Sequence, residues 1–319
     1  MMKGRDFLRI SDFTGAEIDR LLAGASLLKR ARREGIRHRL LQDCTLAMIF
    51  EKPSLRTRAT FETAMTHLGG HSLDLAAEHL QMGVRETIED VGRNLCRWVD
   101  AIMARVFDHS TVELLASSST VPVVNGLSDR SHPCQILADL LTIKERKGAL
   151  EGLKVAYVGD GFNVASSLLA AAPRLGFSIA LACPEGYEPR PLLIKEARAV
   201  ANGAVIEVVR DGFEAVAGAD VVYTDSWISM GQEAETERRL RVFAPYQVNE
   251  RLMAAAKPDA LFMHCLPAHR GQEVTDAVMD GPQSVVFDQA ENRLHVQKSL
   301  LVHLIRGEDA FKEIGQTVT

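Results

Sequence analysis

The chain has 319 residues, about twice the usual length of a single domain, so two domains are expected. With 46% hydrophobic and 25% charged residues, its composition is that of a globular protein and argues against a disordered, collagen-like or coiled-coil chain. The 37 basic and 42 acidic residues leave a net charge of −5, which argues against a surface built to hold nucleic acid. Any anion that the protein binds must therefore be held by a local cluster of basic residues.

Five cysteines are widely spread along the chain and form no C-x-x-C pair: Cys44, Cys96, Cys134, Cys183 and Cys265. Their odd number and spacing indicate neither a disulfide framework nor a zinc site, and they suit a reducing compartment. The N-terminal segment has charges throughout and no apolar core of a signal peptide, and no apolar run reaches the roughly 18 residues that span a bilayer. We therefore expect a soluble, cytoplasmic protein with neither a membrane nor a nucleic acid as partner.

The first predicted helix runs from Thr14 to about Glu34, because Thr14-Gly-Ala-Glu17 is a capping box and apolar residues recur at helical spacing after it. Its other face carries a basic run: Lys29, Arg30, Arg32 and Arg33. This run is either a solvated helix face, which the adjacent Glu34 and the lack of interleaved aromatics favour, or an anion patch.

Short apolar runs then alternate with helical patterns. The predicted strands of the first half are TLAMIF (45–50), HSLDLA (71–76), AIMARV (101–106) and VPVVNG (121–126), with helices to Leu68, near 86–98 and after 106. A long helix from Pro133 to Lys147 ends at Gly148. The alternation restarts with KVAYVGD (154–160), SIALACP (178–184), VIEVVR (205–210), DVVYTD (220–225), LFMHCLP (261–267) and SVVFDQ (284–289).

This alternation predicts an α/β fold of two doubly wound domains with parallel sheets. An interdomain helix at about 133–150 joins them, and a last amphipathic helix, about Glu291 to Arg306, returns to the first domain. The predicted domains are 1–148, with about 291–319 packing back on it, and 149–290. Because ligands of such sheets bind beyond the carboxyl ends of the strands, the loops after the apolar runs should carry the chemistry and face a shared cleft.

The loop after TLAMIF reads E-K-P-S-L-R-T-R (51–58) and leads into a helix. Free backbone N–H groups at the helix start, together with arginine and hydroxyl donors, suit a phosphate. Arg105 ends the strand AIMARV, and Pro133 fits the first position of the long helix, so His132 and Gln135 can face a ligand there. Taken singly, each is more often a charged helix start or a cap.

Together, these residues resemble the aspartate/ornithine carbamoyltransferase family, which joins carbamoyl phosphate to an amine. S-x-R-T-R (54–58), the arginine of ARVFDH and H-P-x-Q (132–135) resemble the family's carbamoyl-phosphate site in order and spacing. In the second half, G-D-G-F-N (159–163), D-S-W-I-S-M-G-Q-E (225–233), H-C-L-P (264–267) and E-N-R (291–293) resemble the ornithine branch. The motifs run from about residue 50 to 295.

The resemblance implies attack by the δ-amine of L-ornithine on the carbamoyl carbon, giving L-citrulline and phosphate, as in arginine biosynthesis, with no metal and no cofactor. The implied catalytic residues are Arg105, His132, Asp225 and Cys265. The implied carbamoyl-phosphate site comprises Ser54, Leu55, Arg56, Thr57, Gln81, Arg105, His132, Pro133, Cys134, Gln135, Cys265, Leu266 and Arg293. The implied ornithine site comprises Leu127, Asn163, Asp225, Ser229 and Met230.

In this resemblance, Asp225 pairs with the substrate's α-ammonium group and, with Cys265, orients the amine and assists its deprotonation. The loop 229–231 closes on the amino acid, and Arg58 holds the phosphate loop. The resemblance also implies a homotrimer in which Gln81 reaches the phosphate of the neighbouring subunit.

Two positions depart from the family's pattern. Leu55 replaces a common threonine and loses a hydroxyl donor, and Phe162 replaces the first of two asparagines. A Cys/His nucleophile at 264–265 is not expected, because adjacent strand residues point to opposite faces.

Other interpretations remain open. A dinucleotide-dependent dehydrogenase is disfavoured by Val164, where the glycine fingerprint needs Gly or Ala, and by the lack of an acidic residue after SIALACP. A non-enzymatic sensor would keep the same loops. Putrescine, N-acetylornithine or aspartate as the amine acceptor is separated from ornithine only by assay.

Overall fold

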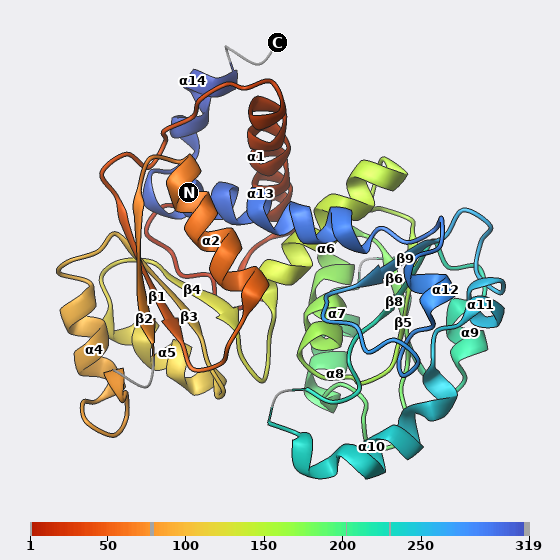
Figure 1. The fold of residues 1–319 in the computed structure, drawn as a ribbon. Coiled ribbons are helices and arrows are strands. Elements are labelled where there is room, and N and C mark those ends of the chain that lie inside the picture. The colour runs from red at the N-terminus through yellow and green to blue at the C-terminus, as the bar shows by residue number, and fades with distance from the viewer. Residues whose placement is uncertain (1, 77–79, 202, 230, 316–319) are drawn as a thin grey trace. The chain divides into compact units, whose positions relative to one another are not determined.

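The computed structural model describes residues 2–76, 80–201, 203–229 and 231–315 (Figure 1). The chain splits into two compact units: unit 1 is Met1–Leu141 with Glu291–Thr319, and unit 2 is Thr142–Ala290. Each unit contains a parallel sheet with flanking helices, which confirms the predicted α/β class.

Unit 1 contains a four-stranded sheet in the order β2-β1-β3-β4. Its strands are β1 (Thr45–Phe50), β2 (His71–Ala76), β3 (Ala101–Arg105) and β4 (Val123–Leu127). Its helices are α1 (Gly15–Arg33), α2 (Leu55–His67), α4 (Ile88–Leu95), α5 (His109–Ser118) and the C-terminal α14 (Lys312–Gly315). Two helices cross from one unit's residues to the other's: α6 (Pro133–Lys147) and α13 (Val286–Ile305).

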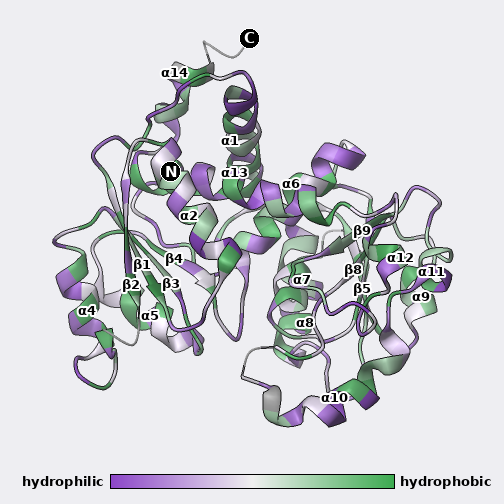
Figure 2. Ribbon diagram, in the orientation of Figure 1, coloured by the Kyte–Doolittle hydropathy of each residue, from purple (hydrophilic) through white to green (hydrophobic). Residues whose placement is uncertain are grey.

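The core of unit 1 follows the strand alternation. Residues Ala47, Ile49, Ile102 and Ala104 on one face of the sheet pack with buried side chains of α4 and α5, among them Val91, Leu95, Val112 and Leu115. Figure 2 shows hydrophobic residues along the strands of both sheets. The predicted capping box starts α1: the hydroxyl of Thr14 accepts from the Glu17 N–H, and the Glu17 carboxylate accepts from the Thr14 N–H.

Unit 2 contains a five-stranded sheet in the order β7-β6-β5-β8-β9. Its strands are β5 (Lys154–Val158), β6 (Ser178–Ala182), β7 (Ile206–Val209), β8 (Val221–Thr224) and β9 (Leu261–His264). Its helices are α7 (Asn163–Leu175), α8 (Pro191–Ala199), α9 (Gly212–Val216), α10 (Thr236–Phe243), α11 (Glu250–Met253) and α12 (Asp276–Met279). In Figure 1, α7 and α8 lie on one side of this sheet and α9, α11 and α12 on the other.

The prediction of a strand at 284–289 is wrong. Ser284 forms a single parallel bridge with Phe262, and α13 begins two residues later at Val286. The run S-V-V-F-D is short and apolar, and such a run fits a buried helix start as well as a strand. The last helix therefore begins five residues earlier than the predicted Glu291.

The C-terminal part of α13 packs on α1 within unit 1. The hydroxyl of Ser299 donates to the carbonyl of Leu21 at 2.7 Å, and the ammonium group of Lys29 donates to the side chain of Asn292 at 2.7 Å. Lys29 is therefore buried, and the basic run of α1 is only in part a solvated face. Among the described residues, no helix is both long and apolar enough to cross a membrane.

Candidate active site

In both sheets, the loops that carry predicted site residues lie where the order of the strands reverses. In unit 1, β1 lies between β2 and β3, so the loops after β1 and β3 leave the same sheet edge on either side of a switch point. In unit 2, the corresponding switch lies between β5 and β8. Open parallel sheets bind ligands at such points, and the predicted site residues lie at both of them.

The loop predicted to bind phosphate, residues 51–58, leads into a well-formed helix start. Ser54 is the N-cap of α2, and its hydroxyl accepts from the Thr57 N–H at 3.2 Å. Leu55, at the first helical position, is 79% exposed, so its side chain makes no core contact. Arg58 forms an ion pair with Asp74 on β2 and lies over the ring of Phe50. Arg58 therefore holds the loop, as predicted.

Thr57 is the meeting point of residues from four distant stretches of unit 1. Its hydroxyl accepts from Arg105 at 3.3 Å and from Arg293 at 3.0 Å. Arg293 also donates to the side-chain oxygen of Gln135 at 2.6 Å and contacts His132 Nε2 at 3.4 Å. All five side chains are buried. The structure thus brings together the predicted residues of the loop, the third strand, α6 and α13.

His132 is held neutral in this cluster. Burial, and then the charges of Arg293, Arg105 and Arg56, lower the pKa of the imidazole well below its usual value of 6.5. Arg293 can only donate, so Nε2 of His132 accepts and the ring proton resides on Nδ1. His132 is therefore a neutral group with one donor.

Asp139 is a supporting residue that sequence reasoning missed. Its carboxylate accepts from the amide nitrogen of Gln135 at 2.8 Å, which directs the amide oxygen of Gln135 toward Arg293. Both side chains are fully buried. The spacing of four residues on a helix was the available signal, since such pairs share one face.

Four predicted residues of unit 1 lie outside the contacts of the Thr57 cluster. Pro133 begins α6, and the thiol of Cys134 donates to the backbone of Asn125 at 3.5 Å, with burial raising its pKa to about 12. Leu127 ends β4, where its carbonyl accepts from the Val106 N–H. Gln81 is exposed and turns the chain at φ 46°, its carbonyl accepting from two following N–H groups.

In unit 2, the ends of β8 and β9 meet at Asp225 and Cys265. The thiol of Cys265 donates to Oδ1 of Asp225 at 2.9 Å, and the Ser226 N–H donates to the same oxygen at 2.7 Å. Asp225 and Cys265, which we predict to orient the amine of ornithine, are therefore in direct contact.

His264 supports the backbone that follows it. Its Nδ1 accepts from the Leu266 N–H at 2.9 Å, and its Nε2 lies 3.3 Å from the buried carboxylate of Glu273. Leu266 has a positive φ of 59° and precedes a cis peptide bond to Pro267. The His264 ring thus contacts Leu266 and Glu273, in agreement with the expectation that it does not activate Cys265.

The remaining ornithine-site predictions lie on two loops. Asn163 is buried at the start of α7, and a Cβ at Gly161 just before it would lie 2.3 Å from the backbone nitrogen of Pro189, so only glycine fits there. Ser229 is tied to Gln232 by two hydrogen bonds of 3.0 Å, one to the side chain and one between backbones. Met230 lies outside the described residues.

Arg239 of α10 is a second residue that sequence reasoning missed. It is 3% exposed, pairs with Asp160 after β5 and donates from Nε to the carbonyl of Trp227 in the loop that carries Ser229. Burial raises the pKa of Asp160 to about 6, although Arg239 acts in the opposite direction. The pair links the loop after β5 to the loop after β8.

Asp225, His264 and Cys265 have ligand-type atoms within 4.8 Å of one another, an arrangement seen in some metal sites. Nδ1 of His264 already accepts from the Leu266 N–H, and Nε2 faces the Glu273 carboxylate at 3.3 Å without an aligned hydrogen bond. This set fits a metal poorly, and the absence of a metal from the reaction stays a prediction.

Comparison with known proteins defines the class. Residues 5–145 match the family described as "Aspartate/ornithine carbamoyltransferase, carbamoyl-P binding domain", and residues 151–304 match its "Asp/Orn binding domain". The chain belongs to the aspartate/ornithine carbamoyltransferase family.

Two similar proteins and one similar solved structure are ornithine carbamoyltransferases. The anabolic ornithine carbamoyltransferase of Pyrococcus furiosus is 57% identical over 308 residues, 96% of this chain and 98% of that protein. The ornithine carbamoyltransferase of Anoxybacillus flavithermus is 56% identical over 306 residues, 95% of this chain and 98% of that protein. The solved ornithine carbamoyltransferase structure from P. furiosus matches with a TM-score of 0.94, over 96% of this chain and 99% of that one.

Proposed function

We propose that the two half-sites described above perform the ornithine carbamoyltransferase reaction, with unit 1 binding carbamoyl phosphate and unit 2 binding ornithine. The chain transfers the carbamoyl group of carbamoyl phosphate to the δ-amine of L-ornithine, which yields L-citrulline and phosphate. The observation that carries the assignment of roles is the Thr57 hydroxyl, on which two buried arginines converge at the start of a helix. The reaction requires that the δ-amine of ornithine bound by unit 2 reach the carbamoyl carbon of carbamoyl phosphate bound by unit 1.

The start of α2 receives the phosphate. The backbone N–H groups of Leu55 and Arg56, the helix dipole and the Arg56 side chain are suited to a dianion, and they stabilise the charge of inorganic phosphate as it leaves. Leu55 contributes only its backbone N–H, so one hydroxyl donor of the usual pattern is missing. These groups hold carbamoyl phosphate in one orientation, so the carbamoyl transfer takes place between two positioned substrates.

The carbamoyl oxygen becomes an oxyanion when the amine attacks. Thr57 accepts from two guanidinium groups and therefore retains its own proton to donate, and neutral His132 adds the Nδ1–H donor. Arg105 supplies positive charge beside them. Each such preorganised donor is typically worth about 10²–10³ in rate. Gln135 and Arg293 contact the carbamoyl amide and oxygen in this arrangement.

On the amine side, the Asp225 carboxylate pairs with the substrate's α-ammonium group, and the Cys265 thiol fixes the orientation of that carboxylate. The δ-amine has a lysine-like pKa near 10 and must lose a proton before it attacks. The Asp225–Cys265 pair assists that loss. Asn163, Ser229 and Met230 complete the amino-acid site, and Leu127 offers a backbone contact.

We further propose a cytoplasmic homotrimer that works in arginine biosynthesis. Gln81 supports this assembly because it is exposed at a turn and its side chain has no hydrogen-bond partner elsewhere in the described chain. In a trimer, Gln81 of each subunit reaches the neighbour's phosphate.

The deciding experiment supplies the purified protein with carbamoyl phosphate and, separately, ornithine, putrescine, N-acetylornithine and aspartate. Phosphate release and carbamoylated product are measured for each amine. Ornithine is expected to give citrulline with the highest kcat/KM. The assignment is overturned if another amine reacts faster or if ornithine gives no citrulline, and phosphate-loop binding without any product would favour the sensor interpretation.

A further inference from the structure

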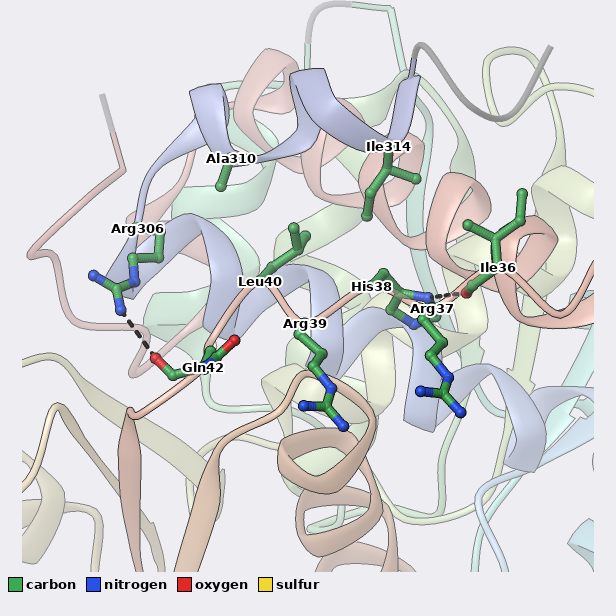
Figure 3. A pocket seen from close by; sticks show the side chains of 9 residues that line it. All are labelled: Ile36, Arg37, His38, Arg39, Leu40, Gln42, Arg306, Ala310 and Ile314. Carbon is green, nitrogen blue, oxygen red and sulfur yellow. Dashed lines mark hydrogen bonds between the residues drawn. The ribbon is translucent and has the colours of Figure 1, made fainter.

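Unit 1 contains a second concentration of basic side chains that takes no part in the reaction described above. A cavity of about 690 Å³ lies between the segment that follows α1 and the C-terminal segment. Figure 3 shows its lining, which consists of Ile36, Arg37, His38, Arg39, Leu40, Gln42, Arg306, Ala310 and Ile314. No carboxylate lines it among the side chains that the structure describes.

The basic groups of this cavity wall lack acidic partners. Arg37 and Arg39 are exposed, extend side by side in Figure 3 and make no hydrogen bond or ion pair within the described residues. Among the residues that the structure describes, Arg306 donates only to the carbonyl of Gln42 and the sulfur of Cys44. Elsewhere in unit 1, by contrast, Arg5, Arg33 and Arg58 each lie against a carboxylate.

More positive charge lies directly behind the wall. The fully buried ammonium group of Lys298 contacts Nε2 of His38, and Arg32 contacts Nε2 of His67 at 2.9 Å. Burial, together with the neighbouring Arg32, lowers the pKa of Lys298 to about 7 and that of His67 to about 4. Arg32 and Lys298 thus repel one another behind the wall, and a bound anion would offset positive charge there.

We propose that this cavity is a second anion site, selective for a small molecule that carries two or more phosphate groups. Paired guanidinium groups match phosphate oxygens in charge and in hydrogen-bond geometry. Ile36, Leu40, Ala310 and Ile314 line the same cavity and offer an apolar surface for an attached organic group. A nucleoside di- or triphosphate has this combination of features.

The test must separate this site from the phosphate loop. Pyrophosphate is titrated by calorimetry, at 150 mM NaCl, into the full-length protein whose phosphate loop is filled with a stable phosphonate analogue of carbamoyl phosphate. One further pyrophosphate per chain is expected to bind. The double variant Arg37→Gln/Arg39→Gln is expected to weaken that binding at least about tenfold, because two charge-assisted contacts are removed. ATP is expected to bind more tightly than pyrophosphate, because the apolar wall contacts its organic group.

The matched control is Arg238→Gln/Arg241→Gln, which removes two exposed arginines of α10 and should leave the affinity unchanged. Circular dichroism and the Tm establish that both double variants are folded. Absence of pyrophosphate binding to the filled wild-type protein overturns the proposal, as does equal binding by the Arg37/Arg39 variant. A change of sedimentation in that variant with unchanged anion binding would instead assign the cluster to contacts between copies of the chain.

Discussion

At the scale of single residues, the site depends on where protons reside. Thr57 accepts two hydrogen bonds, and Arg105 and Arg293 cannot accept any, so the threonine proton points to whatever third group enters. A hydroxyl polarised in this way is a better donor to an oxyanion than an isolated one.

Thr57→Val tests this role. The variant keeps the shape of the side chain but removes the hydroxyl, so kcat is expected to fall about 10²-fold or more. The loss of an acceptor for two buried guanidinium groups should also lower the free energy of unfolding by about 1–3 kcal/mol. Thr57→Ser restores the hydroxyl and should recover most of kcat. Steady-state kinetics and urea unfolding measure both effects, and a Val variant with wild-type kcat would exclude the donor role.

Cys265→Ala tests the amine half-site. The thiol donates to Asp225 at 2.9 Å, so its removal should leave the carboxylate less firmly oriented. We expect a lower kcat and an altered pH profile with ornithine, while the KM for carbamoyl phosphate changes less. Cys265→Ser, which keeps a donor, should lie between the two. Unchanged turnover and an unchanged pH profile in Cys265→Ala would contradict the role.

The sequence predicted the residues that can contact a ligand directly, but, apart from Arg58, it did not predict the residues that hold them in place. Arginine, histidine and glutamine at strand ends and helix starts indicate a ligand-binding site. In the structure, Arg105 and Arg293 both donate to Thr57, and Arg293 contacts His132. Asp139 and Arg239 lie inside helices, where a charged residue usually faces solvent. Their burial depends on partners far along the chain, which local patterns cannot reveal.

At the scale of elements, alternation predicted the strands well because buried parallel strands are nearly continuous apolar runs. Nine of these runs form strands within the described chain, and only SVVFDQ does not. There, Ser284 is the one residue that pairs, and the chain then turns into α13. Neighbouring elements, rather than composition, decide between strand and helix in a run this short.

A single side chain of α10 holds two loops of unit 2. Arg239 joins Asp160 to the carbonyl of Trp227, and it lies over the rings of Tyr187 and Phe243 at about 5 Å. These contacts fix the start of the loop that leads to Ser229. α10 therefore positions the loop that the proposed ornithine site uses, through Arg239 rather than through a proposed site residue.

Arg239→Met should raise the KM for ornithine and lower the free energy of unfolding by about 3–5 kcal/mol, because Asp160 is left as a buried charge without its partner. Combining it with Asp160→Asn removes that charge and should recover much of the stability, but not the KM. Urea unfolding and ornithine titrations separate the two effects. A folded Arg239→Met variant with wild-type KM for ornithine would show that the loop does not depend on this contact.

At the scale of the whole molecule, several buried histidines are neutral in the folded chain. Burial is the largest cause of the lowered pKa values of His38, His109, His132 and His303. In each case the unfolded chain binds more protons than the folded chain below about pH 6.5. Asp160 acts in the opposite sense, since its folded pKa of about 6 lies above the ordinary 3.8, and so does Asp6, whose pKa burial also raises. These two carboxyls are outnumbered by the buried histidines.

The stability of the protein should therefore rise with pH over a wide range. Between pH 7.5 and 5.5 the free energy of unfolding is expected to fall by about 2–5 kcal/mol as the unfolded histidines take up protons. Between pH 7.5 and 9 it should rise further, because the pKa of Lys298 is about 7 in the folded chain and 10.5 in the unfolded one. Lys298→Met should flatten the upper part of the curve only. Urea unfolding at a series of pH values measures the curve, and a stability that increases as pH falls from 7.5 to 5.5 would refute the assignment of neutral buried histidines.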